Sequence, residues 1–156
     1  MTNRKLETRL AILGYPLPRE VATFGLYLPS VRAGDLVFTS GALPMKNGEL
    51  MVKGHVGGDV SLEEAEEGAR LCVVNALGAI RAEVGSLADV ARIVKMTGYV
   101  NSAAGFTDQP AVMNAASLFL IDIFEDAGRC ARSAVGVAEL PLGAAVEVEL
   151  VAQLKS

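Results

Sequence analysis

One arginine and two glutamates near the C-terminal end are the residues whose types and spacing best suit the chemistry of a small anion. Arg132 stands among small residues near the start of a strand that we expect over residues 129–139. A second expected strand, over residues 144–154, carries Glu147 and Glu149 on one face, because side chains alternate along a strand. A guanidinium presents a planar fork of donors that matches a carboxylate in a two-point contact. We therefore expect Arg132 to face the glutamates across a pocket for a small carboxylate.

The elements that must position these residues follow from the hydrophobic periodicity of the sequence. Further strands are expected over 27–31, 35–40 and 90–100, and helices over 2–13, 61–83 and 110–127. A turn at 140–143, which contains Pro and Gly, joins the two C-terminal strands, and a hairpin turn at 32–35 joins the first two strands. The glycine-rich stretch 45–58 is expected to be a loop. Gly41, just after the second strand, allows a ligand or another backbone segment to come close.

The order of these elements predicts an α+β fold with two helices packed on one face of a mixed sheet, plus an N-terminal helix. Ser61 and Glu64 have the spacing of a capping box at the start of the first of the two packed helices. Pro110 suits the first turn of the second packed helix, and Gly128 suits its end. Cys72 falls on the apolar stripe of the first packed helix, which favours a buried structural role.

The composition indicates one globular domain over residues 1–156, in which residues 1–22 are a helix and a connector. The chain has 156 residues, of which 51% are hydrophobic and 21% are charged, so it is able to bury a core. We expect a cytoplasmic protein, because no apolar run approaches the roughly 20 residues of a membrane helix and the N-terminus is too polar for a signal peptide. Cys72 and Cys130 lack the spacing of a metal or redox pair, so no metal site is expected. The net charge of −4 disfavours nucleic acid, and His55 as the single histidine provides no imidazole pair for RNA cleavage.

Three separated sequence blocks occur in an order that is typical of one protein family. The blocks are Phe24–Tyr27 with Val31–Gly34, Thr39–Gly41 and Pro44; then Val112–Ala115; then Ala131–Ser133 with Leu140–Pro141 and Val146–Glu149. They cover most of the chain after Thr23 and resemble the Rid family, the YjgF-type enamine/imine deaminases that are also called L-PSP proteins. The long 45–58 stretch and the N-terminal helix indicate a divergent branch of that family with an N-terminal extension.

The resemblance implies a chorismate-mutase-like fold and a homotrimer with sites between neighbouring subunits. Arg132 would anchor the substrate carboxylate, Tyr27 would donate a hydroxyl to water or substrate, and Glu147 would lie near the attacking water. Ser40 and Asn114 match substrate-binding residues. The implied reaction is hydrolysis of a 2-imino acid, formed from an enamine, to a 2-oxo acid and ammonia, with no metal or organic cofactor. The last expected strand mixes carboxylates and aliphatic side chains, which suits burial against another subunit.

Each of these assignments has a structural alternative. Tyr27 fits an ordinary strand aromatic, Ser40 a turn residue, and Asn114 a cap near a helix start. Arg132 fits a solvated arginine at a strand end, or a structural ion pair with Glu147. Many family members have a cysteine two residues after the arginine, where this chain has alanine, so no thiol chemistry is expected there. The alternative functions are a non-catalytic oligomer that binds small carboxylates as a sensor or carrier, and a mutase or related C=N hydrolase on the same fold.

Overall fold

One mixed sheet of five strands forms the centre of the molecule, described by a computed structural model for residues 2–21, 23 and 25–156. The α-helices are α1 (Asn3–Ile12), α2 (Leu62–Val84) and α3 (Gln109–Phe124). The strands are β1 (Ser30–Ala33), β2 (Leu36–Thr39), β3 (Met45–Lys46), β4 (Glu49–Leu50), β5 (Val90–Asn101), β6 (Ala131–Val137) and β7 (Val146–Leu154). The sheet order is β1-β2-β7-β5-β6, in which only the β5–β6 pair is parallel, and β3 and β4 form a separate hairpin.

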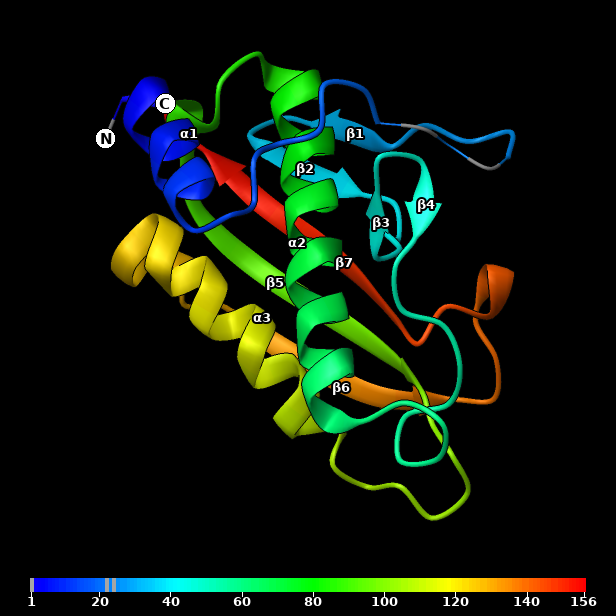
Figure 1. The fold of residues 1–156 in the computed structure, drawn as a ribbon. Coiled ribbons are helices and arrows are strands. Elements are labelled where there is room, and N and C mark those ends of the chain that lie inside the picture. Colours follow the sequence, from blue (N-terminus) through cyan, green and yellow to red (C-terminus); the bar gives the residue numbers. More distant parts are fainter. Residues whose placement is uncertain (1, 22, 24) are drawn as a thin grey trace.

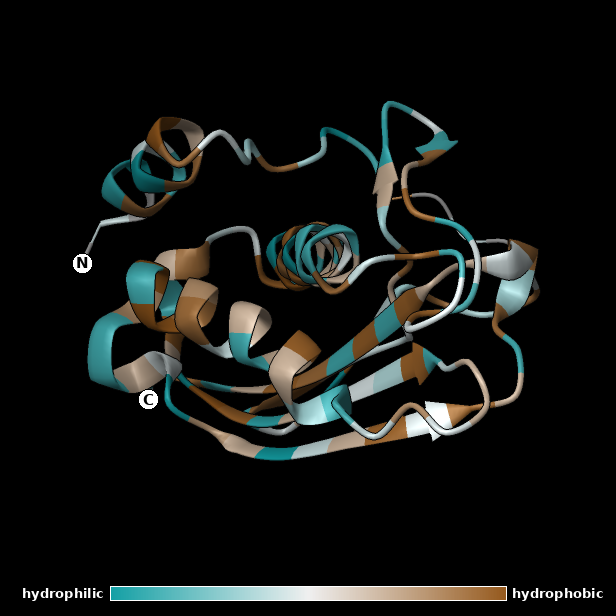
Figure 2. Cartoon of the chain, turned by 60° about the horizontal axis from the view of Figure 1, so that its bottom comes forward, coloured by the Kyte–Doolittle hydropathy of each residue, from teal (hydrophilic) through white to brown (hydrophobic). Residues whose placement is uncertain are grey.

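Helices α2 and α3 cover one face of this sheet, and the described helices leave the opposite face open (Figures 1 and 2). The last strand, β7, shows this division along its length. Val146, Val148 and Leu150 are buried in the core beneath the helices, whereas Glu147 and Glu149 point from the other face. The predicted α+β fold, with two helices on one face of a mixed sheet and an N-terminal helix, is confirmed.

The 23-residue helix α2 begins with the predicted capping box. The Glu64 amide donates to Ser61 Oγ at 3.2 Å, and the Ser61 amide donates to Glu64 Oε2 at 2.8 Å. The hydrogen bond from the Ser61 amide lowers the pKa of the Glu64 carboxyl. The helix ends at Gly85, whose φ of 84° lies in the left-handed region that glycine adopts without strain. Among the described residues, neither α2 nor another helix combines the length and apolarity needed to cross a membrane.

Strands β6 and β7, which carry Arg132 and the glutamates, are not neighbours in the sheet. The expectation that Arg132 faces the glutamate strand is wrong, because the 12-residue strand β5 lies between β6 and β7. This strand pairs in parallel with β6 along one edge and antiparallel with β7 along the other. The connection between β6 and β7 contains a 3-10 turn at Pro141–Gly143 and therefore has to cross the end of β5.

The stretch 45–58, expected to be a loop, contains the short β3–β4 hairpin. Asn47 and Gly48 at its tip have φ values of 52° and 82°. Two successive positive φ values are typical of the turn that joins two twisted antiparallel strands. The Asn-Gly pair was present in the sequence, but the flanking strands are only two residues long and give no periodic signal.

Other boundaries also differ from those expected. Strand β1 begins at Ser30, so Tyr27 precedes the strand and the alternative of an ordinary strand aromatic is wrong. Strand β1 continues through Arg32, so the first hairpin turn is shorter than predicted. Helix α3 ends at Phe124 and is followed by a 3-10 turn through Gly128. A side chain at Gly128 would collide with the Leu120 carbonyl group, so the tight turn depends on glycine at this position.

The N-terminal helix packs beside α3, and the segment that follows it crosses α2 (Figure 1). Leu6 and Leu10 of α1 are buried in the main core. After Gly14, the ring of Tyr15 meets the edge of the Phe119 ring, with centroids 4.9 Å apart and planes at 69°. We call residues 15–21 the connector. Its position over α2 makes it part of the site described below.

Candidate active site

A cavity of about 890 Å³ opens between the start of β7, the segment after β2, helix α2 and the connector. Tyr27, Ser40 and Glu147 line this cavity. Arg132 and Asn114 lie elsewhere, in contact with each other. The structure therefore divides the five predicted site residues into two groups, a cavity group and an arginine group.

The Glu147 carboxyl is half-buried in the cavity wall and lies against Gly41. A side chain at Gly41 would collide with Glu147 Oε1, so the glycine leaves the space that this carboxyl occupies. Burial, and to a smaller extent the neighbouring Glu149 carboxylate, raise the pKa of Glu147. Glu149 accepts a hydrogen bond from the Tyr99 hydroxyl at 3.2 Å. A carboxyl group with a raised pKa is suited to take up and release a proton closer to neutral pH.

Ser40 holds the backbone segment beside Tyr27 in place. Its Oγ donates to the Leu28 carbonyl oxygen at 2.6 Å, and its amide donates to the Pro29 carbonyl oxygen at 2.9 Å. The hydroxyl oxygen still has lone pairs that can accept a hydrogen bond from a ligand in the cavity. Tyr27 lines the same cavity with 48% of its surface exposed.

Arg132 is held against α3 by three hydrogen bonds. Its Nη1 donates to Asn114 Oδ1 and to Ser117 Oγ, both at 3.0 Å, and its Nη2 approaches the Pro110 carbonyl oxygen at 3.5 Å. Asn114 lies past the first turn of α3 and orients the guanidinium, so the structure gives it a different role from a helix-start cap. The remaining guanidinium donors are available for an anion.

Ser117 is a member of the arginine group that the sequence analysis missed. It lies three residues after Asn114 in α3, and residues at this spacing share one helix face. That spacing was the signal that could have revealed it. Serine is a common residue, so the spacing alone does not predict a contact between Ser117 and Arg132. The position of Arg132 in the tertiary structure is also needed.

Other positive charges surround the start of β6. Burial raises the pKa of the Cys130 thiol, and Arg132, Lys95 and Arg92 oppose that rise. Lys95 Nζ donates to Ser133 Oγ at 3.0 Å on the adjacent strand. Lys95 and Ser133 lie on the open face of the sheet, whereas the Arg132 side chain extends from the helix-covered face.

Arg132 and Glu147 are on opposite faces of the sheet within one chain. Arg132 pairs with Met96, which is buried on the helix-covered face, and its side chain reaches α3. Glu147 pairs with Tyr99 on the open face, three positions further along β5. The alternative of a structural ion pair between Arg132 and Glu147 is therefore wrong for the single chain. The cavity group and the arginine group therefore each contain some of the residues that the sequence analysis placed in one pocket.

Two further residues considered in the sequence analysis lie outside the cavity group. His55 approaches Glu139 at 3.2 Å and Asp59 at 3.9 Å, and does not line the cavity. Cys72 is fully buried in α2, and burial raises its thiol pKa well above the usual value. Across residues 2–21, 23 and 25–156, we find no group of three or more His, Cys, Asp or Glu side chains arranged to hold a metal ion.

Comparisons with known proteins agree with this architecture. Residues 7–154 match the family described as "YjgF/chorismate_mutase-like, putative endoribonuclease". The chain is 37% identical over 153 residues to Protein TCP17 of Trypanosoma cruzi, a match that covers 97% of this chain and 96% of that protein. The crystal structure of Atu1372 from Agrobacterium tumefaciens has a TM-score of 0.92 and 38% identity, covering 98% of this chain and 94% of that one. Escherichia coli TdcF, crystallised with bound serine, has a TM-score of 0.64 and 27% identity, covering 88% of this chain and 94% of that one.

A mixed sheet with two helices on one face, matched along nearly its whole length, defines the class of this protein. The chain belongs to the YjgF/L-PSP family, and its fold is the chorismate-mutase-like α+β fold of that family.

Proposed function

We propose that the protein is a deaminase that hydrolyses 2-imino acids, formed from enamines, to 2-oxo acids and ammonia. The observation that carries this proposal is the Glu147 carboxyl, which has a raised pKa and lies in the cavity wall with Ser40 and Tyr27. Such a carboxyl can guide a proton during the attack of water on an imine carbon. The guanidinium of Arg132, already oriented by Asn114 and Ser117, supplies the complementary group for a substrate carboxylate.

The proposed reaction needs only positioning and one proton relay. Arg132 holds the carboxylate, and a water molecule attacks the carbon of the protonated imine while one water proton passes to Glu147, so that a carbon–oxygen bond forms. Glu147 returns this proton to the nitrogen, the carbon–nitrogen bond breaks, and the hydroxyl proton passes to the departing ammonia as the carbonyl group forms. Iminium and water thus become 2-oxo acid and ammonium. Holding the reactants in this geometry supplies most of the rate gain, because the iminium is already electrophilic.

We further propose that the complete site forms between neighbouring subunits of a homotrimer. The cavity group and the arginine group are on opposite faces of one chain, so an arginine group can reach a cavity group only from another chain. The open sheet face supports this assembly, because it carries Val31, Phe38 and Val151 in one row across three strands. Exposed apolar rows of this kind are typical of subunit interfaces.

Two features of the relatives support the proposal. TdcF was crystallised with serine, a small molecule that carries a carboxylate, as the proposed substrates do. The match to Atu1372 spans more of this chain than the match to TdcF, which supports placing the chain in a divergent branch of the Rid deaminases with an N-terminal extension. We place the activity in the reducing cytoplasm, where the free cysteines Cys72 and Cys130 stay reduced.

The family description also names an endoribonuclease, and we propose the deaminase in preference to it. The net charge of −4 opposes phosphate binding, and His55 lies beside Glu139, outside the cavity. A non-catalytic carboxylate-binding oligomer would use the same Arg132. Hydrolysis of an imino acid distinguishes the deaminase from both the endoribonuclease and the non-catalytic binding protein.

The test couples an amino-acid oxidase, which generates imino acids, to this protein and follows the formation of 2-oxo acid. Wild type should accelerate the formation of 2-oxo acid. Arg132→Ala should lower kcat/KM for this reaction roughly 10- to 150-fold, the loss expected for a hydrogen bond to a charged group. Arg129→Ala is the matched control, because Arg129 is exposed and pairs with Asp126 three residues earlier, away from the arginine group. Carboxylate binding without acceleration would support the sensor or carrier, and degradation of added RNA would support the nuclease.

A further inference from the structure

The cavity is much larger than a small imino acid needs. Its volume of about 890 Å³ lies in the upper part of the range of roughly 300–1,000 Å³ found for sites of drug-sized ligands. Besides Glu147 and the charged residues Arg19, Glu20 and Lys46, the cavity has a lining that is mostly apolar. Its apolar residues include Leu17, Leu43, Leu71, Val74 and Ala79. The site therefore has an apolar chamber beyond the groups that the proposed chemistry uses.

The connector forms the outer wall of this chamber and is fixed to α2. The Pro18 carbonyl oxygen accepts a hydrogen bond from Arg81 Nη2 at 2.9 Å. Gly78 on α2 leaves just enough room for the connector, because an added Cβ there would lie 2.7 Å from Pro18 Cγ. These contacts hold the wall at a defined distance from the helix.

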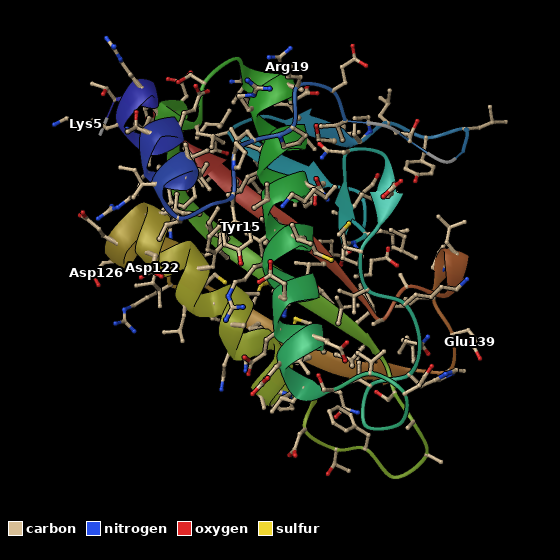
Figure 3. All side chains as sticks on the ribbon, in the orientation of Figure 1. Lys5, Tyr15, Arg19, Asp122, Asp126 and Glu139 are labelled. Atoms are coloured by element: carbon tan, nitrogen blue, oxygen red, sulfur yellow. The ribbon has the colours of Figure 1, made fainter. Side chains whose placement is uncertain are left out.

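Tyr15, the first residue of the connector, is also fixed to the helices (Figure 3). Its hydroxyl donates to Glu67 Oε2 at 2.5 Å, and its ring packs on Phe119. Burial and the Glu67 carboxylate raise the pKa of Tyr15 to about 12, so the hydroxyl remains a donor throughout the physiological range. The connector is therefore tied to helices at its first residue, Tyr15, and at Pro18.

The opposite wall of the chamber is fixed by Asn75. Its Nδ2 donates to the carbonyl oxygens of Leu43 and Met45, both at 2.9 Å. The Asn75 amide thus provides hydrogen-bond donors for two backbone carbonyl groups. The residues that carry these carbonyl groups, Leu43 and Met45, also line the cavity. A cavity with fixed apolar walls favours an apolar ligand group that fills it, because each buried methylene adds to binding.

We propose that the connector is a specificity wall that selects 2-imino acids with a bulky apolar side chain, which occupies the chamber between Leu17 and Ala79. This inference rests on the proposed deaminase function. The carboxylate end of the substrate meets Arg132 of a neighbouring subunit, the imine carbon lies near Glu147, and the side chain points along α2.

The test changes the chamber from two opposite walls. Leu17→Asp introduces a charge into the connector wall, and Ala79→Leu fills the chamber from α2. Ala79 is buried, lies outside the main core cluster and lines the cavity, so we expect the larger side chain to occupy part of the chamber. Ile12→Asp is the matched control, because Ile12 is 80% exposed on α1 and does not line this cavity.

The measurement is kcat/KM for imino acids generated from leucine, phenylalanine and alanine. Wild type should prefer the leucine- and phenylalanine-derived substrates over the alanine-derived one by about tenfold or more, the discrimination that an apolar pocket provides. Both chamber variants should lose most of that preference, because their kcat/KM falls more for the leucine- and phenylalanine-derived substrates than for the alanine-derived one. Thermal unfolding of each variant checks that the fold persists.

A binding measurement separates failure of this inference from failure of the proposed function. Calorimetric titration with 4-methyl-2-oxopentanoate and with pyruvate does not require turnover. Preferential binding of the larger oxo acid, lost in both chamber variants, would support the specificity wall even if no imine is hydrolysed. Equal affinities, no binding of either, or unchanged selectivity in the variants would overturn it. Dissociation of the assembly in both variants with unchanged selectivity would show that a neighbouring chain fills the chamber.

Discussion

Gly41 leaves the space that the Glu147 carboxyl, the proposed proton relay, occupies. We predict that Gly41→Ala changes stability little but lowers kcat/KM by about tenfold to a hundredfold, because a shift of about 1 Å in a catalytic group has that effect. The colliding atom is the end of a flexible side chain, so the Glu147 carboxyl moves and the backbone stays. Imine hydrolysis and thermal unfolding, measured together, check the prediction.

The matched control for this substitution is Gly58→Ala. An added Cβ at Gly58 meets Ala103 at 3.3 Å and the His55 carbonyl oxygen at 3.4 Å, away from the cavity group. Its activity should equal that of wild type. Equal activity of Gly41→Ala would show that the observed Glu147 position is not needed for the reaction.

The raised pKa of Glu147 predicts a pH dependence of stability. The folded protein holds this proton more tightly than the unfolded chain, whose value is near 4.5. The associated stability is therefore present below the unfolded pKa and is lost as pH rises through the folded pKa. Glu147→Gln removes this loss, so its free energy of unfolding minus that of wild type should be larger near pH 7 than near pH 4.

Urea unfolding at several pH values tests this sign. Glu83→Gln is the control, because Glu83 is exposed near the end of α2. A difference between Glu147→Gln and wild type that does not vary with pH would contradict a raised pKa at Glu147.

At the scale of single elements, helix α2 depends on its capping box to define where it begins. We predict that Ser61→Ala lowers the free energy of unfolding by about 1 kcal/mol, because the Glu64 amide loses its partner. Glu64→Gln should lose less, because glutamine can still accept from the Ser61 amide. Chemical denaturation near neutral pH measures both. A larger loss in Glu64→Gln than in Ser61→Ala would contradict the capping argument.

Strand β5 has the largest effect on where the functional groups lie. It pairs along both edges and so separates the strand of Arg132 from the strand of Glu147. Within the single chain, Arg132 donates hydrogen bonds to Asn114 and Ser117 of helix α3. The arrangement keeps the guanidinium oriented at the edge of the sheet, where a neighbouring subunit is able to meet it.

At the scale of the whole molecule, the open sheet face predicts the assembly. We expect sedimentation to give three times the 16.3 kDa mass of the chain. Phe38→Asp should dissociate the trimer, because Phe38 is 43% exposed in the apolar row of the open face and a buried charge there lacks a partner. Deaminase activity should fall with dissociation, since each site would lose the Arg132 of its neighbour.

Leu118→Asp is the control for this substitution. Leu118 is 61% exposed on α3, away from the open sheet face, so its variant should remain trimeric and active. A wild-type monomer that is fully active would show that one chain holds a complete site and would refute the assembly.

Local chemistry in the sequence determined much of this protein. The capping box at Ser61, proline at the first turn of α3, and alternation of glutamates and aliphatics along β7 act between residues close in the chain. These signals predicted the helices, the long strands and the α+β fold. Arg132 and Glu147 were singled out by the match of a guanidinium to a carboxylate, by the alternation along the last strand, and by the family resemblance.

Only the tertiary structure decided how those residues are arranged. The order of strands, the opposite faces taken by Arg132 and Glu147, and the contact of Ser117 with Arg132 depend on pairings between residues far apart in the chain. The apolar chamber is formed by segments that are distant in the sequence and individually unremarkable in composition. Periodicity fixes which face of a strand is buried, whereas the neighbour of that strand is set by packing of the whole sheet.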